Sequence, residues 1–180
     1  METRAESIVI KYASSGTSDT STIKVYGKEI YYGVSEHTVT STQADYLRYQ
    51  LGGYQCGISY SVSGGYAYAI YPYTLSYYTT AAQEKKVTQS VNQLISDLEL
   101  EYISSEYGII KLAYDYITEN VTYDDTHLKD ETYKLKNIAY AALINKTAVC
   151  QSFSALLYRI LNTCGADCRI NSGDADGNHA

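Results

Sequence analysis

The residues of this 180-residue sequence best suited to covalent chemistry are Cys150 and His179. Cys150 comes just before a run in which apolar residues recur at 153, 156, 157, 160 and 161, the spacing of a helix that buries one face. The thiol therefore lies at a helix N-terminus, where the helix dipole and unpaired backbone N–H groups favour the thiolate. With His179 as the base, the pair predicts nucleophilic acyl transfer through a thioester.

The segments that must bring these two residues together follow one another in the sequence. The helix is predicted to end at residues 162–165, where poor helix formers lead to a glycine that can adopt the left-handed conformation. Residues 166–171 are short enough for a strand, and residues 172–178 form a turn rich in Gly, Asp and Asn. A helix, strand and turn in this order can return His179 to the helix start.

These segments resemble the transglutaminase-like superfamily, which has papain-like thiol chemistry, in its bacterial secreted or cell-surface branch. The resemblance covers the chain from about Thr79 and rests on five segments: 117–125, 139–143, 148–151, 165–169 and 173–180. It implies that Cys150 is the nucleophile and His179 its partner, that the substrate is a protein or peptide, and that the protein is extracellular or on the cell surface. We expect no cofactor and no metal.

An oxyanion formed in such a reaction needs hydrogen-bond donors. The backbone N–H of Cys150 is one natural donor because it opens a helix, and the side chain of Gln151 or Tyr140 could add a second. The acyl acceptor decides between cross-linking, deamidation and proteolysis, and the sequence leaves these three open.

Two features depart from the family's pattern. Ser152 stands where the family usually carries glycine, and the sequence ends at Ala180, before the aspartate that usually follows the histidine on a later strand. Because a carboxylate of this kind orients the imidazole, its absence favours an alternative, a non-catalytic surface interaction module. A domain that ends here would leave an open sheet edge, so we expect poor stability or self-association through that edge.

Composition excludes two classes of partner. The net charge of −6 and the pI near 5.0 argue against nucleic acid, since binding phosphates requires clustered Lys and Arg. No stretch reaches the apolar length of a membrane span, and the first residues do not form a signal peptide. The chain has 22 Tyr against one Phe and no Trp, which suits an adhesive strand-rich surface but also a simple preference for Tyr over Phe.

Other groups of reactive side chains have a simpler interpretation. Cys164 and Cys168 could form a disulfide or remain buried thiols. A zinc site that combines these two with Cys150 and His179 is disfavoured, because the paired C-x-x-C spacing is missing. Residues 124–127 hold Asp124, Asp125 and His127, for which turn chemistry is more probable than a metal or acid–base site.

We predict an α+β protein with a β-rich N-terminal region at 1–78 and an incomplete papain-like core at 79–180, in which helices pack on a small antiparallel sheet. The N-terminal elements are strands at 7–12, 22–26 and 29–34, a helix at 42–51 capped by Thr42 and stopped by Gly52–Gly53, and a hairpin of 56–62 with 66–71 that Pro72 ends. The C-terminal elements are helices at 80–98, 106–120 and 134–144, the second with Tyr107, Ile110, Tyr114 and Ile117 on one face.

Overall fold

The computed structural model describes residues 7–13, 32, 36, 45–175 and 178–179, which form two compact units. The first unit holds strand β1 and residues 51–77, and the second holds residues 45–50 together with the chain from Tyr78 onward. The combination of a β-sheet unit and a helical unit confirms the predicted α+β class. None of the described helices has the length and apolar character needed to cross a membrane.

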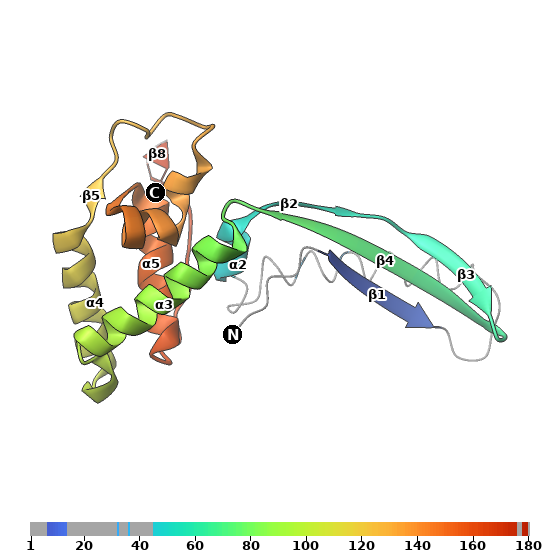
Figure 1. Ribbon diagram of the computed structural model, residues 1–180, viewed down its shortest axis with the longest axis horizontal. Coiled ribbons are helices and arrows are strands. Elements are labelled where there is room, and N and C mark those ends of the chain that lie inside the picture. The colour runs from blue at the N-terminus through green and yellow to red at the C-terminus, as the bar shows by residue number, and fades with distance from the viewer. Residues whose placement is uncertain (1–6, 14–31, 33–35, 37–44, 176–177, 180) are drawn as a thin grey trace. The chain divides into compact units, whose positions relative to one another are not determined.

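The first unit is an antiparallel sheet organised on its longest strand, β4 (Tyr66–Tyr77) (Figure 1). β1 (Ser7–Ala13) pairs with one edge of β4, while β2 (Leu51–Cys56) and β3 (Ser59–Ser63) share the other edge. β3 and β4 form the predicted hairpin, and Gly64 and Gly65 turn it with φ of 59° and 79°. Positive φ at both positions is what a two-residue hairpin turn of matching twist requires, and glycine adopts it without strain.

Pro72 does not end the hairpin strand as predicted, because β4 continues through it to Tyr77. The Pro72 carbonyl accepts a hydrogen bond from the Gly57 N–H at 3.0 Å, between the stretches that pair with β3 and with β2. A strand residue points its N–H and its C=O toward the same edge, so the missing N–H of Pro72 faces this junction. The proline therefore costs the sheet little, and the strand passes through.

The other N-terminal predictions have mixed outcomes. The strand at 7–12 is confirmed, whereas the segment 22–26, most of 29–34 and the Thr42 cap lie outside the described residues. The helix predicted at 42–51 is α2 (Asp45–Gln50), and it stops before Leu51. Residues 51–56 form β2 because they pair with residues 73–77 of β4, so Gly52 and Gly53 lie in a strand with an irregular register.

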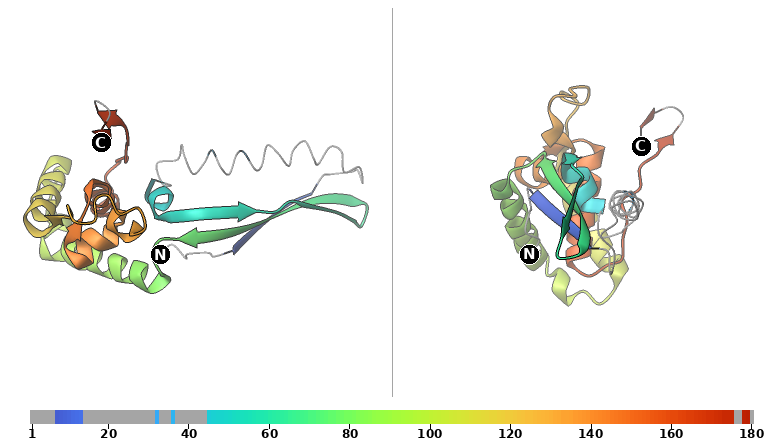
Figure 2. Two further views of the ribbon diagram at one scale, coloured as in Figure 1. Left: turned by 90° about the horizontal axis from the view of Figure 1, so that it is seen from above. Right: turned by 90° about the vertical axis from the view of Figure 1, so that its right-hand side faces the viewer.

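The second unit is built around α5 (Cys150–Thr163), which packs against α3 (Ala81–Asp97) and α4 (Glu106–Asn120). Figure 2 shows these helices from two further sides. The predicted capping box starts α3: the Thr80 N–H donates to Gln83 Oε1 at 2.8 Å, and the Gln83 N–H donates to Thr80 Oγ1 at 3.2 Å. A short 3-10 helix, η2 (Leu100–Tyr102), links α3 to α4.

Only one of the four apolar residues that the sequence places on one face of α4 is buried. Tyr107 and Tyr114 are 75% and 56% exposed and Ile110 is 38% exposed, whereas Ile117 is buried. The face that packs on the core instead includes Ala113, which is fully buried. A small residue at the contact allows two helices to approach closely, and this preference outweighs the larger apolar side chains on the other face.

The single helix predicted at 134–144 is two short pieces, the 3-10 helix η3 (Lys134–Asn137) and the π-helix η4 (Ala141–Asn145). After η4 the chain forms β6 (Thr147–Ala148), which pairs in parallel with β5 (Thr122–Tyr123). β7 (Asp174–Ala175) and β8 (Asn178–His179) form an antiparallel pair near the C-terminus. The described strands of this unit therefore form two short pairs, and the larger antiparallel sheet belongs to the first unit.

Residues 166–171 are not the strand that the sequence predicts, and the Ile170 N–H and the Arg169 side chain instead bond a buried carboxylate. Asp45 of α2 is fully buried and accepts hydrogen bonds from Arg169 Nε at 2.8 Å, Arg169 Nη2 at 3.0 Å and the Ile170 N–H at 2.9 Å. Arg48 Nη2 donates to the same carboxylate at 2.6 Å. Burial by itself would raise the pKa of Asp45, but the hydrogen bonds from Arg169 and Ile170 and the charge of Arg48 lower it.

We expect Asp45→Ala to lower the free energy of unfolding by about 3 kcal/mol, because it leaves the buried Ile170 N–H and two arginines without their acceptor. Since the folded-state pKa is lowered, the stabilisation by Asp45 is present above the ordinary carboxyl range near 4 and is lost as the pH falls below it. Chemical denaturation of both proteins at neutral and at acidic pH measures this difference.

Asp115→Ala is the matched control, since Asp115 bonds Lys111 on the exposed surface of α4. Removing such a surface pair changes stability by about 0.5 kcal/mol or less. Equal unfolding free energies for the two variants would contradict the role assigned to Asp45.

Candidate functional site

Cys150 is the first residue of α5 and its side chain is exposed. The helix starts differently from its neighbours: Thr80 and Ser105 cap α3 and α4 with side-chain oxygens, whereas Val149 precedes α5 and provides no side-chain hydrogen bond. The N–H groups at a helix start have no acceptor within the helix. This helix start therefore combines an accessible thiol with backbone donors that no side chain of the N-cap residue occupies.

Tyr123 lies beside this thiol because β5 pairs with β6. The Thr122 N–H donates to the Lys146 carbonyl at 2.8 Å and the Asp124 N–H donates to the Ala148 carbonyl at 2.9 Å, which places Tyr123 opposite Ala148. Burial raises the pKa of Tyr123, the charge and the side-chain hydrogen bond of Cys150 raise it further, and a hydrogen bond with the Cys150 backbone opposes the rise. The Tyr123 phenol therefore lies close to Cys150.

Sequence reasoning did not single out Tyr123 as a site residue. It lies within the segment 117–125 that carries part of the family resemblance, but the contact depends on strand pairing across more than twenty intervening residues. The ring also packs against Phe153 of α5, with centroids 6.3 Å apart.

A small pocket opens next to Cys150. Its wall includes Gln151 and Ser154 of α5, residues 170–172 and Tyr49 of α2, and its volume is ≈ 50 Å³. Of the predicted oxyanion donors, Gln151 is therefore at the site, while Tyr140 is half-buried and packs against the helical core. His179 belongs to strand β8, and the position of its side chain lies outside what the structure describes.

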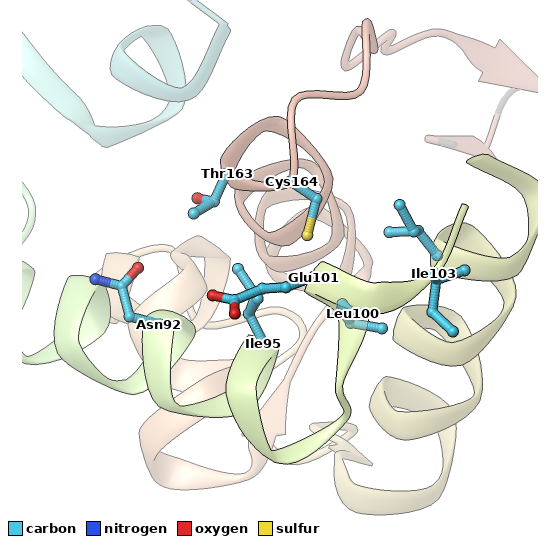
Figure 3. A pocket seen from close by; sticks show the side chains of 8 residues that line it. Asn92, Ile95, Leu100, Glu101, Ile103, Thr163 and Cys164 are labelled. Atoms are coloured by element: carbon cyan, nitrogen blue, oxygen red, sulfur yellow. The ribbon is translucent and has the colours of Figure 1, made fainter. Parts of the chain in front are cut away.

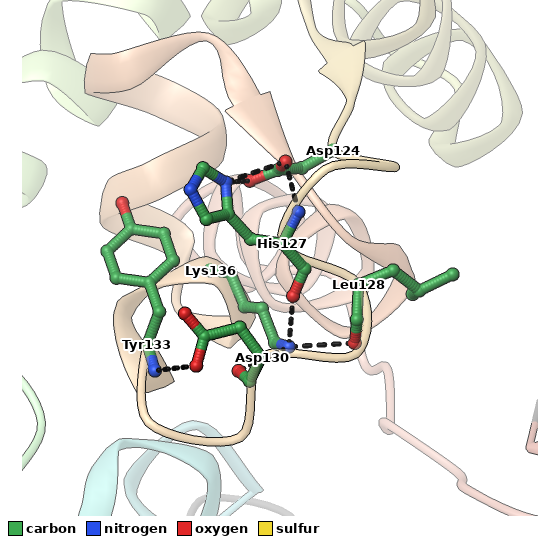
Figure 4. Close-up of polar contacts among 6 residues, drawn as sticks. All are labelled: Asp124, His127, Leu128, Asp130, Tyr133 and Lys136. Carbon is green, nitrogen blue, oxygen red and sulfur yellow. Dashed lines mark hydrogen bonds and ion pairs between the residues drawn. The ribbon is translucent and has the colours of Figure 1, made fainter.

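The polar loop after Tyr123 is held by its own hydrogen bonds (Figure 4). The buried Asp124 carboxylate accepts from the His127 N–H at 3.0 Å and contacts His127 Nδ1 at 2.9 Å. Burial opposes ionisation of Asp124, but the hydrogen bonds and charge of His127 outweigh it and lower the pKa. These contacts agree with the turn interpretation of residues 124–127.

The Lys136 side chain extends into the same loop (Figure 4). Its ammonium group is buried and donates to the carbonyls of His127, Leu128 and Asp130, the last two at 2.8 and 2.7 Å. An ammonium has three donors, so all three are used. The loop that follows β5 is therefore held together by the Lys136 side chain.

Cys164 and Cys168 are free, half-buried thiols, which agrees with the second of the two interpretations left open by the sequence. Burial raises the pKa of both, and Glu101 adds to the effect at Cys164 and Asp167 at Cys168. Cys164 lies in a larger cavity of ≈ 300 Å³ at the opposite end of α5 from Cys150, together with Asn92 and Glu101 (Figure 3). A thiol kept protonated is a poor nucleophile, so this larger cavity is not the place for thiol chemistry.

Within the described part of the chain, no group of three or more His, Cys, Asp or Glu side chains is arranged to hold a metal ion.

Ser152 explains why the predicted helix at 134–144 is interrupted. Its side chain is fully buried, and its hydroxyl donates to the Ile138 carbonyl at 2.6 Å and accepts from the Ala142 N–H at 3.2 Å. In a continuous α-helix, this N–H would bond that carbonyl directly. The hydroxyl is thus inserted into one helical hydrogen bond, and it joins the first turn of α5 to η4.

We expect Ser152→Ala to lower the free energy of unfolding by about 1–3 kcal/mol, because the buried Ala142 N–H loses its acceptor. Ser154→Ala is the matched control: Ser154 is exposed, its hydroxyl bonds only the Cys150 carbonyl among the contacts described, and its loss should cost about 0.5 kcal/mol or less. Chemical denaturation compares the two variants, and equal losses would show that the inserted hydroxyl does not stabilise the helix start.

Comparison with known proteins agrees with this geometry. Residues 98–180 match the model of the transglutaminase-like superfamily, and this segment contains Tyr123, Cys150 and His179. Comparisons with curated proteins and with solved structures found no match. Residues 98–180, which hold the exposed thiol and the elements on both sides of it, are therefore similar to the transglutaminase-like superfamily.

Proposed function

We propose that the second unit is a thiol acyl-transfer domain in which Cys150 is the nucleophile and His179 the general base. The observation that carries this proposal is the exposed Cys150 thiol at an uncapped helix start, close to Tyr123, within the segment that matches the superfamily. The other two thiols of the unit have raised pKa values, so Cys150 is the thiol best placed to react.

The reaction would proceed in two steps. His179 takes the thiol proton, and Cys150 Sγ attacks the carbonyl carbon of a carboxamide or peptide bond. The C–N bond then breaks, the amine or ammonia leaves with the proton from His179, and a thioester remains on Cys150. An amine or water next attacks the thioester, which releases the acyl group and restores the thiol.

The tetrahedral intermediate of each step carries an oxyanion that needs donors. The backbone N–H of Cys150 opens α5, and Gln151 lies in the adjoining pocket. The Tyr123 side chain lies close to Cys150 because β5 pairs with β6, and its hydroxyl is a further candidate donor to such an oxyanion. We add Tyr123 to Gln151 and Tyr140 as the third side chain proposed for this role.

We further propose that the substrates are proteins or peptides outside the cell or on its surface, as the family resemblance implies. The choice between transamidation, deamidation and hydrolysis depends on which acceptor reaches the thioester. Self-association through an open sheet edge also stays a prediction, and sizing chromatography of the full chain tests it.

An activated ester tests the nucleophile and the base without knowledge of the natural substrate. With p-nitrophenyl acetate, we expect release of p-nitrophenolate and an acetyl group on Cys150, identified by peptide mass spectrometry. Cys150→Ala should abolish the modified peptide. His179→Ala should slow acetylation at neutral pH by about 10²-fold, because general-base assistance contributes about 10²–10⁴-fold.

His127→Ala is the matched control, since His127 lies in the loop closed by Asp124 and is proposed to have no part in the chemistry. It should acetylate at the wild-type rate. If Cys150 is not acetylated, or if His179→Ala matches the wild type, the non-catalytic interaction module becomes the better account.

Tyr123→Phe separates oxyanion stabilisation from thiol access. Loss of one oxyanion donor typically costs about 10²–10³ in rate, so acetylation should fall by about that factor. Alkylation by iodoacetamide, which forms no oxyanion, should change little. Tyr114→Phe, an exposed tyrosine of α4, should leave both rates unchanged. A Tyr123→Phe protein that acetylates normally would remove Tyr123 from the proposed site.

A further inference from the structure

The pocket beside Cys150 has a wall that comes from outside the superfamily segment. Tyr49 lies on α2, about a hundred residues before Cys150 in the sequence, whereas the family match begins at residue 98. The other lining residues come from α5 and from the chain that follows it. Helix α2, which directly precedes strand β2 in the sequence, thus contributes a side chain to the pocket beside the Cys150 thiol.

α2 is fixed to the second unit by contacts on two sides. The Asp45 carboxylate holds Arg169 and Ile170, the residues that lead into the pocket wall at 170–172. On the other side, the guanidinium of Arg159 from α5 lies 5.1 Å from the centre of the Tyr46 ring, and the Tyr46 hydroxyl donates to Glu84 of α3 at 2.7 Å. The helix is therefore anchored both to α5 and to the chain after it.

Tyr49 is held within this anchored helix. Its ring is half-buried against the helical core, and the Arg48 guanidinium lies 5.2 Å from the ring centre. Arg48 in turn donates to Asp45, so the side chain that covers the ring is fixed by the same buried carboxylate. A ring held from several sides forms a rigid wall rather than a side chain that moves aside.

The pocket that this wall limits is small. Its ≈ 50 Å³ gives room for only a few water-sized groups, well below the size of pockets that enclose a drug-sized ligand. Ile170 adds an apolar surface, and Gln151 and Ser154 add polar groups. A slim, unbranched acyl chain fits this space, and a branched or aromatic one meets the Tyr49 ring.

We propose that Tyr49 is a specificity-determining residue, which restricts the thiol of Cys150 to small or linear acyl groups and excludes branched and aromatic ones. This inference rests on the proposed function, since it concerns which acyl donors react with Cys150. It does not depend on His179, because the size of the pocket is set by α2, α5 and residues 170–172.

Two alkylating reagents of different width test the proposal. Iodoacetamide is small, and N-benzyl-iodoacetamide carries an aromatic ring on the same reactive group. The rate of Cys150 alkylation by each reagent is measured by mass spectrometry of the Cys150 peptide. The ratio of the rate with N-benzyl-iodoacetamide to the rate with iodoacetamide is then compared between the variants and with the unfolded protein. We expect Tyr49→Ala to shift the ratio toward the bulky reagent by about tenfold, the scale of discrimination by pocket size.

Two variants act as controls. Tyr49→Phe keeps the ring and should retain the wild-type ratio, while Tyr107→Ala removes a 75% exposed tyrosine of α4 that is not part of the pocket wall and should also retain it. Thermal unfolding of each variant shows whether it is folded. If Tyr49→Ala has no melting transition and its ratio of alkylation rates equals that of the unfolded protein, Tyr49→Leu is tested in its place.

The result is independent of the outcome for the proposed function. Alkylation needs only an accessible thiol, so the ratio can be measured even if His179→Ala has no effect on acetylation. A wild-type ratio in folded Tyr49→Ala or Tyr49→Leu would overturn the specificity role of Tyr49, and a shifted ratio with Tyr49→Phe would show that the hydroxyl rather than the ring sets the limit.

Discussion

The helical unit depends on one buried carboxylate. Asp45 is fully buried and gathers the two guanidinium groups and the backbone N–H that would otherwise have no common acceptor. A buried charge is tolerated only when it is paired and hydrogen-bonded, so once Asp45 is inside, Arg169 and Ile170 must lie beside α2. This requirement keeps residues 166–171 out of a strand and places the next residues at the wall of the Cys150 pocket.

The start of α5 is defined by a second polar contact in the interior. The Ser152 hydroxyl replaces a direct helical hydrogen bond between Ala142 and Ile138, and so connects α5 to the segment that delivers the chain to Cys150. The residue that departs from the family's glycine therefore has a structural role here. It holds the helix start in place without occupying the thiol or the N–H groups at its tip.

Different elements around this helix start position Tyr123 and limit the space beside the Cys150 thiol. The parallel pair β5–β6 brings Tyr123 close to the thiol, while α2 limits the space on the pocket side. The larger cavity at the far end of α5 contains a thiol that burial keeps protonated. Cys150 and Cys164 therefore differ in exposure, and the larger of the two cavities belongs to the thiol with the raised pKa.

The sequence by itself determined what depends on neighbours along the chain. The capping box of α3, the extent of α4, the turn at Gly64–Gly65 and the position of Cys150 at the start of α5 follow from local spacing. Only the tertiary structure decided which face of α4 is buried, why β4 passes through Pro72, and why Tyr49 and Tyr123 lie by Cys150. These depend on partners tens of residues away, and periodicity does not encode which distant group will supply a hydrogen bond or fill a space.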